Sequence, residues 1–237
     1  SKDKGVIQIN AKNGVIVCTG GYGANDEMLQ DLCPGNSNWC VLRDSVTEEG
    51  DGIRMAQSVG AALRDMDQIQ LLQTTQPGTG NCVYAYVAPK EAAGYLFFNK
   101  EGHRFIGEDG RRDDISLAAL AQTDALFYML ESSDVITDPD NQYDLLGVPM
   151  SECINAGAII VGDTLEALCE KVGWDYETVK AQIDEYNANV DANALKDEYG
   201  RALFTIKQEN GPWYSIPRTP SVHHTMGGVV INADTQV

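Results

Sequence analysis

Apolar residues at intervals of three and four positions predict four helices, because that spacing places side chains on one helix face. These helices are expected at residues 26–32, 53–63, 163–172 and 175–190. A fifth helix, starting at Asp113 or Asp114, is expected from the apolar positions Ile115, Ala118 and Ala119.

Capping signals indicate where several of these helices begin and end. Asn25 or Asp26 has a side chain suited to cap the first helix. Asp163 together with Glu166 is typical of a capping box at the start of the 163–172 helix, and Gly173 is placed to end it.

Continuous apolar runs predict two strands near the start of the chain, at residues 6–9 and 14–18. The second run is solidly apolar, as in a strand that is covered on both faces. It leads into Thr19, Gly20 and Gly21 before the first helix. A strand, a glycine turn and a helix start often cradle a phosphate or a ribose, although the spacing here is not that of a dinucleotide fingerprint.

Elsewhere the pattern predicts a hairpin at residues 95–105, with its turn at 99–102. Residues 74–95 are expected to form strand and loop, and residues 132–150 a surface loop. An arginine just before the fifth helix adds its charge to the positive end of the helix dipole and can bind a carboxylate through two hydrogen bonds. The alternative is a surface arginine paired with Asp113 or Asp114.

Composition indicates a soluble globular protein, with 43% hydrophobic and 22% charged residues in 237. No apolar run is long enough to span a membrane, and no secretory leader is visible. The formal charge of −18 argues against nucleic-acid binding, so an anionic substrate needs a local basic pocket. The six cysteines lack metal-ligand spacing, and no metal site is predicted.

Two of the three histidines lie beside a glycine pair, in His223-His224-Thr225-Met226-Gly227-Gly228. Successive side chains of an extended backbone alternate sides, so one ring is expected to face a ligand and the other to pack behind it. The glycines allow the main chain to approach something flat. The alternative is a strand end whose histidines cap polar backbone.

Five sequence blocks follow one another along the chain: Thr19-Gly20-Gly21, Gly50-Asp51-Gly52, the stretch from Asn99 to Glu108, Arg111-Arg112-Asp113 and the His223–Gly228 segment. Taken in this order, they resemble the FAD-dependent fumarate reductase and succinate dehydrogenase flavoprotein superfamily, in particular the soluble flavocytochrome c and urocanate reductases.

The resemblance implies an α+β chain in which a capping domain interrupts a Rossmann-type FAD-binding domain. Residues 1–64 then correspond to part of the FAD-binding domain, 65–210 to the cap, and 211–237 to the return into the FAD-binding domain. On this view the chain is an internal piece, without the pyrophosphate loop and the carboxy-terminal substrate arginine. We therefore expect no complete FAD binding or turnover by this piece alone.

The resemblance also implies hydride transfer from reduced FAD to the β-carbon of an α,β-unsaturated acid, with protonation at the α-carbon. Arg112, which matches the arginine of an E-x-x-x-R-D pattern, corresponds to the family's acid, and His224 to a ligand of the substrate carboxylate. The positions that correspond to cofactor contacts are Thr19, Gly20, Gly21, Gly50, Asp51, Gly52, His223, Met226, Gly227 and Gly228.

The chain departs from the family pattern at the substrate site. Leu72 stands where fumarate reductases have a histidine, and an alanine, Ala85 or Ala88, stands where a proton-relaying glutamate belongs. Gln73, Tyr84 and Tyr86 are the candidate substitutes. We therefore expect a substrate other than fumarate, such as an unsaturated acid or enone with an apolar body, and an electron donor of unidentified kind.

Two other interpretations stay open from the sequence. A flavin dehydrogenase of ketosteroid or acyl type would use Tyr84 or Tyr86 as its acid or base. A non-catalytic binding module would retain the cap for ligand capture alone. The sequence does not determine the cellular compartment.

Overall fold

The computed structural model describes residues 8–33, 47–81, 84–85 and 94–237. Tyr86, Ala88 and the first two residues of the strand predicted at residues 6–9 lie outside these ranges. The helices are α1 (Asp26–Leu32), α2 (Asp51–Ser58), α3 (Arg112–Leu120), α4 (Met150–Asn155), α5 (Leu165–Val172) and α6 (Tyr176–Asp191), with a short 3-10 turn at Thr123–Ala125. The strands are β1 (Leu63–Arg64), β2 (Ile69–Thr75), β3 (Leu96–Asn99), β4 (Phe127–Ser132), β5 (Ile160–Gly162), β6 (Trp213–Thr225) and β7 (Gly228–Val229). This mixture of helices and antiparallel strands confirms the predicted α+β class.

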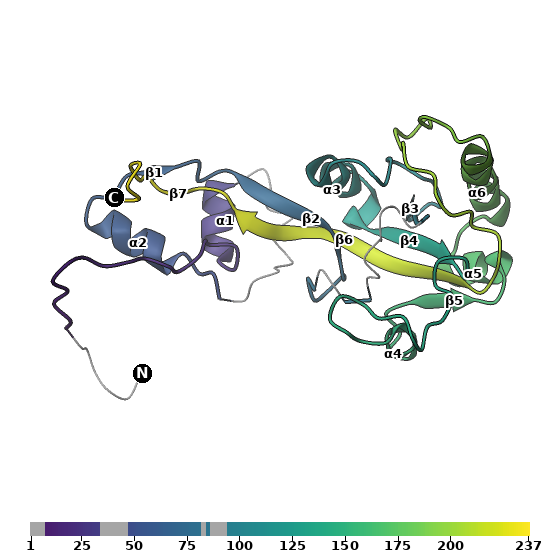
Figure 1. Ribbon diagram of the computed structural model, residues 1–237, viewed down its shortest axis with the longest axis horizontal. Helices are drawn as coiled ribbons and strands as arrows, with labels where there is room; N and C mark the ends of the chain where they lie inside the picture. The colour runs from purple at the N-terminus through teal and green to yellow at the C-terminus, as the bar shows by residue number, and fades with distance from the viewer. Residues whose placement is uncertain (1–7, 34–46, 82–83, 86–93) are drawn as a thin grey trace.

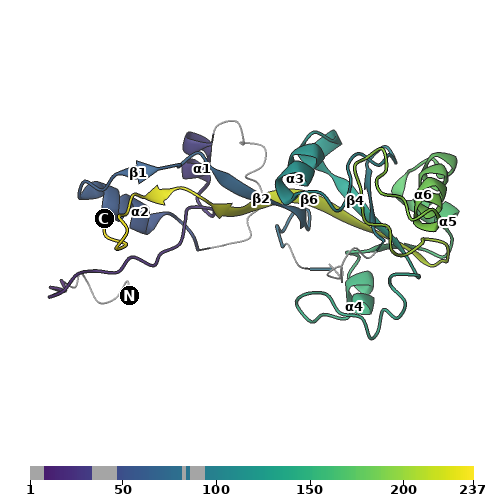
Figure 2. The ribbon, with the colours of Figure 1, turned by 45° about the horizontal axis from the view of Figure 1, so that its top comes forward.

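The molecule is elongated, with two lobes at the ends of a pair of long strands (Figure 1). The smaller lobe holds α1, α2, β1, β7 and the C-terminal end of the chain. The larger lobe holds β3, β4, β5, α4, α5 and α6. Strands β2 and β6 run from one lobe to the other, and α3 lies beside them (Figures 1 and 2).

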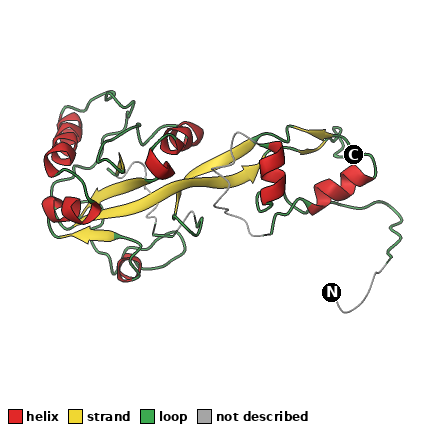
Figure 3. Cartoon of the chain, turned by 180° about the vertical axis from the view of Figure 1, so that it is seen from behind, coloured by secondary structure: helices red, strands yellow, loops and turns green. Residues whose placement is uncertain are grey.

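Strand β6 is the central strand of the sheet, because it pairs with three other strands. Its first half is antiparallel to β4 and β5, and its second half is antiparallel to β2. The sheet order is β2-β6-β4-β3, with β5 also on β6. Two long strands run through the middle of the molecule in Figure 3. Residue 211, where we expected the return into the FAD-binding domain, therefore lies inside the larger lobe.

The larger lobe buries side chains on both faces of this sheet, as alternation along its strands requires. Phe127 and Met129 of β4 face one cluster, to which α3 and α4 contribute. Leu130 of β4 faces the opposite cluster, which α5 and α6 cover. The smaller lobe has its own core, composed of Tyr22, Leu29, Ile53, Leu71 and Val222.

Most helix ends follow the local signals. Asn25 caps α1 by accepting a hydrogen bond from the backbone of Met28, and Asp175 caps α6 in the same way. Gly173 ends α5 in the left-handed conformation, with φ of 88°. The predicted hairpin turn at 99–102 is also present, since the Asn99 amide donates to the His103 carbonyl at 2.8 Å.

Three helices, α2, α3 and α5, differ from the predictions at one or both ends. The side chain of Thr164, not of Asp163, caps α5 by accepting from the Ala167 amide. Helix α2 ends at Ser58, and Leu63 belongs to β1 instead of continuing the apolar face. Helix α3 begins at Arg112, one residue before the earlier of the two predicted starts.

The strand predicted at residues 14–18 is wrong, because these residues form no strand and are exposed. Val15 is 81% exposed and Ile16 is 89% exposed. A strand is stable only where a neighbour pairs its backbone and covers its apolar side chains, and the described part of the chain supplies neither. The prediction of a surface loop at 132–150 is wrong in part, since Ile136 is fully buried and Asp144 is 5% exposed.

Candidate functional site

Arg112 is the first residue of α3 and is exposed. Its Nη1 donates to Gln70 Oε1 at 3.5 Å, which is at the long limit for a hydrogen bond. The neighbouring Arg111 is the N-cap residue of α3, and its side chain is 79% exposed and 4.0 Å from Asp113. The two arginines therefore differ: Arg112 reaches across to β2, and Arg111 stays within its own segment.

His224 stands directly opposite Gln70 in the pairing of β6 with β2. The next pair is Leu71 with Val222, so His223 is an extra residue in β6. Such a bulge brings two consecutive side chains toward the same side. The two imidazole rings accordingly lie with centroids 3.9 Å apart at 46°, and the expectation that they face opposite sides is wrong.

Gln70 is therefore both the hydrogen-bond partner of Arg112 and the register partner of His224, although the three residues come from α3, β2 and β6. The guanidinium, the amide and the imidazole together offer donors for an anionic group, and a guanidinium binds a carboxylate with two parallel hydrogen bonds. Gln70 was not among the site residues predicted from the sequence.

The first two glycine blocks lie against each other in the smaller lobe. The Gly50 amide donates to the Gly21 carbonyl at 3.0 Å. A Cβ on Gly52 would lie 2.0 Å from Thr19 Oγ1, so only glycine permits this approach. Asp51, between these glycines, is the exposed first residue of α2.

The His223–Gly228 block, which is the third to contain a glycine turn, joins the Thr19–Gly21 block through Thr225, at the end of β6. The Tyr22 amide donates to Thr225 Oγ1 at 3.2 Å. A Cβ on Gly21 would lie 1.9 Å from the same oxygen. Gly227 packs as closely on the other side, where its Cβ would lie 2.3 Å from the Asp65 carbonyl. The fold therefore assembles three blocks that are far apart in the sequence.

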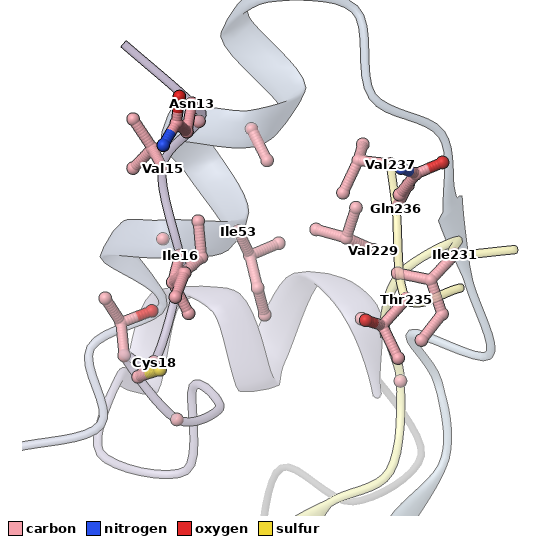
Figure 4. Close-up of a pocket in the computed structure, with 18 residues that line it drawn as sticks. Asn13, Val15, Ile16, Cys18, Ile53, Val229, Ile231, Thr235, Gln236 and Val237 are labelled. Atoms are coloured by element: carbon pink, nitrogen blue, oxygen red, sulfur yellow. The ribbon is translucent and has the colours of Figure 1, made fainter. Parts of the chain in front are cut away.

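A cavity of about 940 Å³ opens between these blocks in the smaller lobe (Figure 4). Val15 and Ile16 line one side, Val229 lies across from them, and Ile53 of α2 lies between (Figure 4). Of the residues predicted to contact a cofactor, five line the cavity: Thr19, Gly20, Gly52, Gly227 and Gly228. Five do not: Gly21, Gly50, Asp51, His223 and Met226.

The lining fits a group that is largely apolar and has polar edges. Aliphatic side chains form much of its walls, and the glycines expose backbone amides and carbonyls that can form hydrogen bonds. A Cβ on Gly228 would meet nothing within 4 Å, so its backbone is open on that side. An isoalloxazine or adenine ring has this combination of properties.

The predicted substrate residues are not all brought to the Arg112 cluster. Leu72 is half-buried on β2, opposite Ser221, two residues from Gln70. Gln73 is half-buried, and its Oε1 has no hydrogen-bond partner within the described ranges. The Tyr84 hydroxyl interacts with Cys153 of α4, where burial raises its pKa, so the tyrosine is directed into the larger lobe. Tyr86 lies outside the described residues.

No helix in the described ranges combines the length and the apolarity needed to cross a bilayer.

The whole chain, residues 1–237, matches the family described as FAD binding domain. It is 34% identical over 235 residues to the NADH:acrylate oxidoreductase of Vibrio harveyi, covering 97% of this chain and 22% of that protein. It is 36% identical over 224 residues to the urocanate reductase of Eggerthella lenta, covering 94% of this chain and 36% of that protein. The chain thus spans between a fifth and two fifths of the length of these relatives.

Solved structures show the same relationship. The open conformation of a flavocytochrome c3 fumarate reductase superposes with a TM-score of 0.70 at 29% identity, over 90% of this chain and 36% of that one. The family match and these relatives confirm the resemblance seen in the sequence and identify FAD as the family's cofactor. The chain belongs to the FAD-binding domain family of the fumarate reductase and succinate dehydrogenase flavoproteins.

Proposed function

We propose that this chain forms part of an FAD-dependent reductase that saturates the carbon–carbon double bond of an α,β-unsaturated acid or enone. The observation that carries the proposal is that Arg112 donates a hydrogen bond to Gln70, the register partner of His224, at the junction of the two lobes. The smaller lobe then belongs to the FAD-binding domain, and the larger lobe is the cap. The relatives that reduce acrylate and urocanate support this assignment.

FAD, when bound, supplies the hydride, and the residues of this chain orient the substrate and deliver the proton. Thr19, Gly20, Gly52, Gly227 and Gly228 would hold the flavin through backbone contacts in the smaller lobe. Gly21 and Gly50 do not line the cavity, but their close packing fixes the path of the loops that do.

Arg112 has two roles in this proposal. Its guanidinium pairs with the substrate carboxylate or carbonyl, and it donates a proton to the α-carbon. In water a guanidinium is a very weak acid. The carbanion that develops at the α-carbon is far more basic, so the transfer is favourable. His224 binds the carboxylate from β6, and Gln70 holds the guanidinium between strand and substrate.

The substrate class follows from Leu72, which stands two residues from Gln70 on the same strand. An aliphatic side chain cannot donate a hydrogen bond to a second carboxylate, and leaving that group unpaired would be costly. We therefore propose a substrate with one carboxylate or carbonyl and an apolar body, and not fumarate. An acrylate with an aryl or alkyl substituent fits this description. The electron donor is a partner that supplies reducing equivalents to the flavin.

The test uses the full-length protein, purified and examined for bound FAD. Its reduction of acrylate, cinnamate, urocanate and fumarate is measured anaerobically with reduced methyl viologen. We expect higher kcat/KM for the monocarboxylates than for fumarate. Introducing the missing histidine, Leu72→His, should shift the preference toward fumarate.

Two outcomes would contradict the proposal. A full-length protein that cannot be loaded with flavin would favour a binding module. Oxidation of a ketosteroid or acyl substrate that is abolished by Tyr84→Phe, with Arg112→Ala unaffected, would favour a dehydrogenase.

A further inference from the structure

A buried network of four charged side chains lies next to the segment that leads into α3. Arg104, Glu108, Asp197 and Arg201 each have side chains that are only 1% exposed. We call them the buried ion network. Two cations face two anions, so the charges balance inside the larger lobe.

Glu108 is the centre of this network, because both of its carboxylate oxygens accept two hydrogen bonds. Oε1 accepts from Arg104 Nε at 3.0 Å and from the Phe97 amide at 3.0 Å. Oε2 accepts from Arg104 Nη2 at 2.9 Å and from Arg201 Nη1 at 3.1 Å. A carboxylate held by four donors has little freedom to move.

The two arginines are also fixed from other directions. Arg104 Nη2 donates to Asp197 Oδ2 at 2.9 Å, and its guanidinium lies 4.3 Å from the centre of the Tyr199 ring. Arg201 donates to the carbonyls of Leu203 and Tyr95, each at 2.6 Å, and lies 4.8 Å from the centre of the Tyr186 ring. Replacing such buried ion pairs by apolar residues often costs no stability, so the network calls for an explanation other than stability.

The segment 197–203 contacts both residues that flank Glu108. The Gly107 amide donates to the Tyr199 carbonyl at 2.8 Å. On the other side, Asp109 Oδ2 accepts from the amides of Ala202 and Leu203, at 2.8 Å each. A Cβ on Gly107 would lie 2.5 Å from the Arg201 amide nitrogen, so the two backbones are in direct contact.

Arg112 follows Glu108 by four residues, and little flexibility separates them. The Gly110 amide donates to the Gly107 carbonyl at 3.1 Å and closes a turn. Arg111 then adopts an extended backbone as the N-cap, and its carbonyl accepts the first hydrogen bond of α3 from Ile115. The position of Glu108 therefore determines where α3 begins and where the Arg112 side chain starts.

We propose that Arg201 is a positioning residue for the reaction: it acts through Glu108 to hold Arg112 against β2 and β6. The inference rests on the proposed function, because it requires Arg112 to act on the substrate. Arg201 is distant from Arg112 along the chain and has no contact with the site itself. It supplies the fork of donors that a lysine cannot reproduce in full.

The experiment is a double-mutant cycle in the full-length, FAD-loaded protein. The variants are Arg201→Met, Arg201→Lys, Arg112→Lys and the double variant Arg201→Met/Arg112→Lys. Leu168→Ala, in the core of the same lobe under α5, is the matched control for lost stability. Three quantities are measured below the lowest Tm: kcat and KM for acrylate, and the Kd of the saturated acid propionate from the flavin spectrum.

If the proposal holds, Arg201→Met lowers kcat by about 100-fold, the scale of a displacement of about 1 Å at a reacting group. Arg201→Lys recovers part of this loss, and Leu168→Ala lowers Tm without changing kcat. In the Arg112→Lys background, Arg201→Met changes kcat by no more than about twofold, which is the margin within which the effects of independent substitutions usually add. Propionate binding weakens with Arg201→Met only while Arg112 is present.

The proposal is overturned if Arg201→Met reduces kcat by the same factor in both backgrounds, or if Leu168→Ala reproduces the loss at equal Tm. If Arg201→Met does not fold, the same comparison is made with Arg201→Lys, and an equal factor in both backgrounds again overturns it. Failure of the proposed function looks different, because Arg112→Lys and Arg112→Ala would then both retain the parent kcat.

Discussion

His224 on β6 and Gln70 on β2 are register partners, and the bulge at His223 lies between them and the next pair. The second half of β6 lies where the sheet passes from the larger to the smaller lobe (Figure 1). The hydrogen bond from Arg112 to Gln70 attaches the start of α3 to the same point. Any movement of α3 relative to β2 and β6 would therefore change the position of Arg112 relative to Gln70 and His224, the residues that we assign to substrate binding.

Replacing Arg112 by alanine should lower kcat of the full-length reductase by about 10²- to 10⁴-fold, the usual contribution of a general acid. Loss of the guanidinium removes both the proton donor and a carboxylate ligand. The matched control is Arg111→Ala. The Arg111 side chain is 79% exposed, and its ion pair is a 4.0 Å contact with Asp113 of the same segment. Equal losses in the two variants would count against a specific role for Arg112.

Gln70→Leu should have a smaller effect than Arg112→Ala. The 3.5 Å contact is long, so we expect a cost of about 1 kcal/mol in transition-state stabilisation, or about fivefold in kcat/KM. Steady-state kinetics with acrylate measure this effect. Gln68→Leu, the same substitution at an exposed position just before β2, should be neutral. A Gln70 variant with unchanged kcat/KM would mean that the contact does not orient Arg112.

Gly21→Ala should disrupt the contact between the Thr19–Gly21 block and the His223–Gly228 block, because the new Cβ would lie 1.9 Å from Thr225 Oγ1. Overpacking of this kind typically costs about 1 to 3 kcal/mol, and it should also lower the flavin content of the purified protein. Gly23→Ala is the control, since its Cβ would make ordinary contacts at 3.7 Å and 3.8 Å. Denaturant unfolding and flavin absorbance give the two measurements, and similar losses in both variants would refute the steric argument.

Glu131 of β4 makes the larger lobe sensitive to pH. Its carboxyl is 1% exposed, and burial raises its pKa to about 7, against the opposing effect of the Arg218 guanidinium. Because the pKa is raised in the folded state, the contribution of this carboxyl to the free energy of unfolding is fully present below its unfolded pKa of 4.5. That contribution is lost as the pH rises through about 7.

Between pH 5 and pH 8 this group should cost about 2 to 3 kcal/mol of unfolding free energy. Glu131→Gln should remove that part of the pH dependence, measured by urea unfolding at both pH values. Glu170→Gln, on the exposed face of α5, should leave the dependence as it is. A Glu131 variant with the pH dependence of the parent would exclude this carboxyl as the cause.

Local signals predicted the helix ends well because a cap depends on a few neighbouring atoms. Asn25, Asp175 and Gly173 each act within one turn of their own helix. The long strand β6 was not predicted, because Pro217 and Pro220 lack the amide hydrogen that an interior strand normally donates. The predicted strand at 14–18 failed for the opposite reason, since its apolar pattern has no paired neighbour in the described structure.

The sequence by itself determined the kinds of chemistry available: an arginine at a helix start, a histidine pair beside glycines, and glycine turns in a fixed order. Those features are local, so they can be read from the residues and their spacing. The tertiary structure alone decided that Arg112 bonds to Gln70, the register partner of His224, that His223 and His224 share a side, and that Arg201 reaches Glu108. Register, bulges and buried charge pairs depend on which segments pack together, and that choice is made by the free energy of the whole fold.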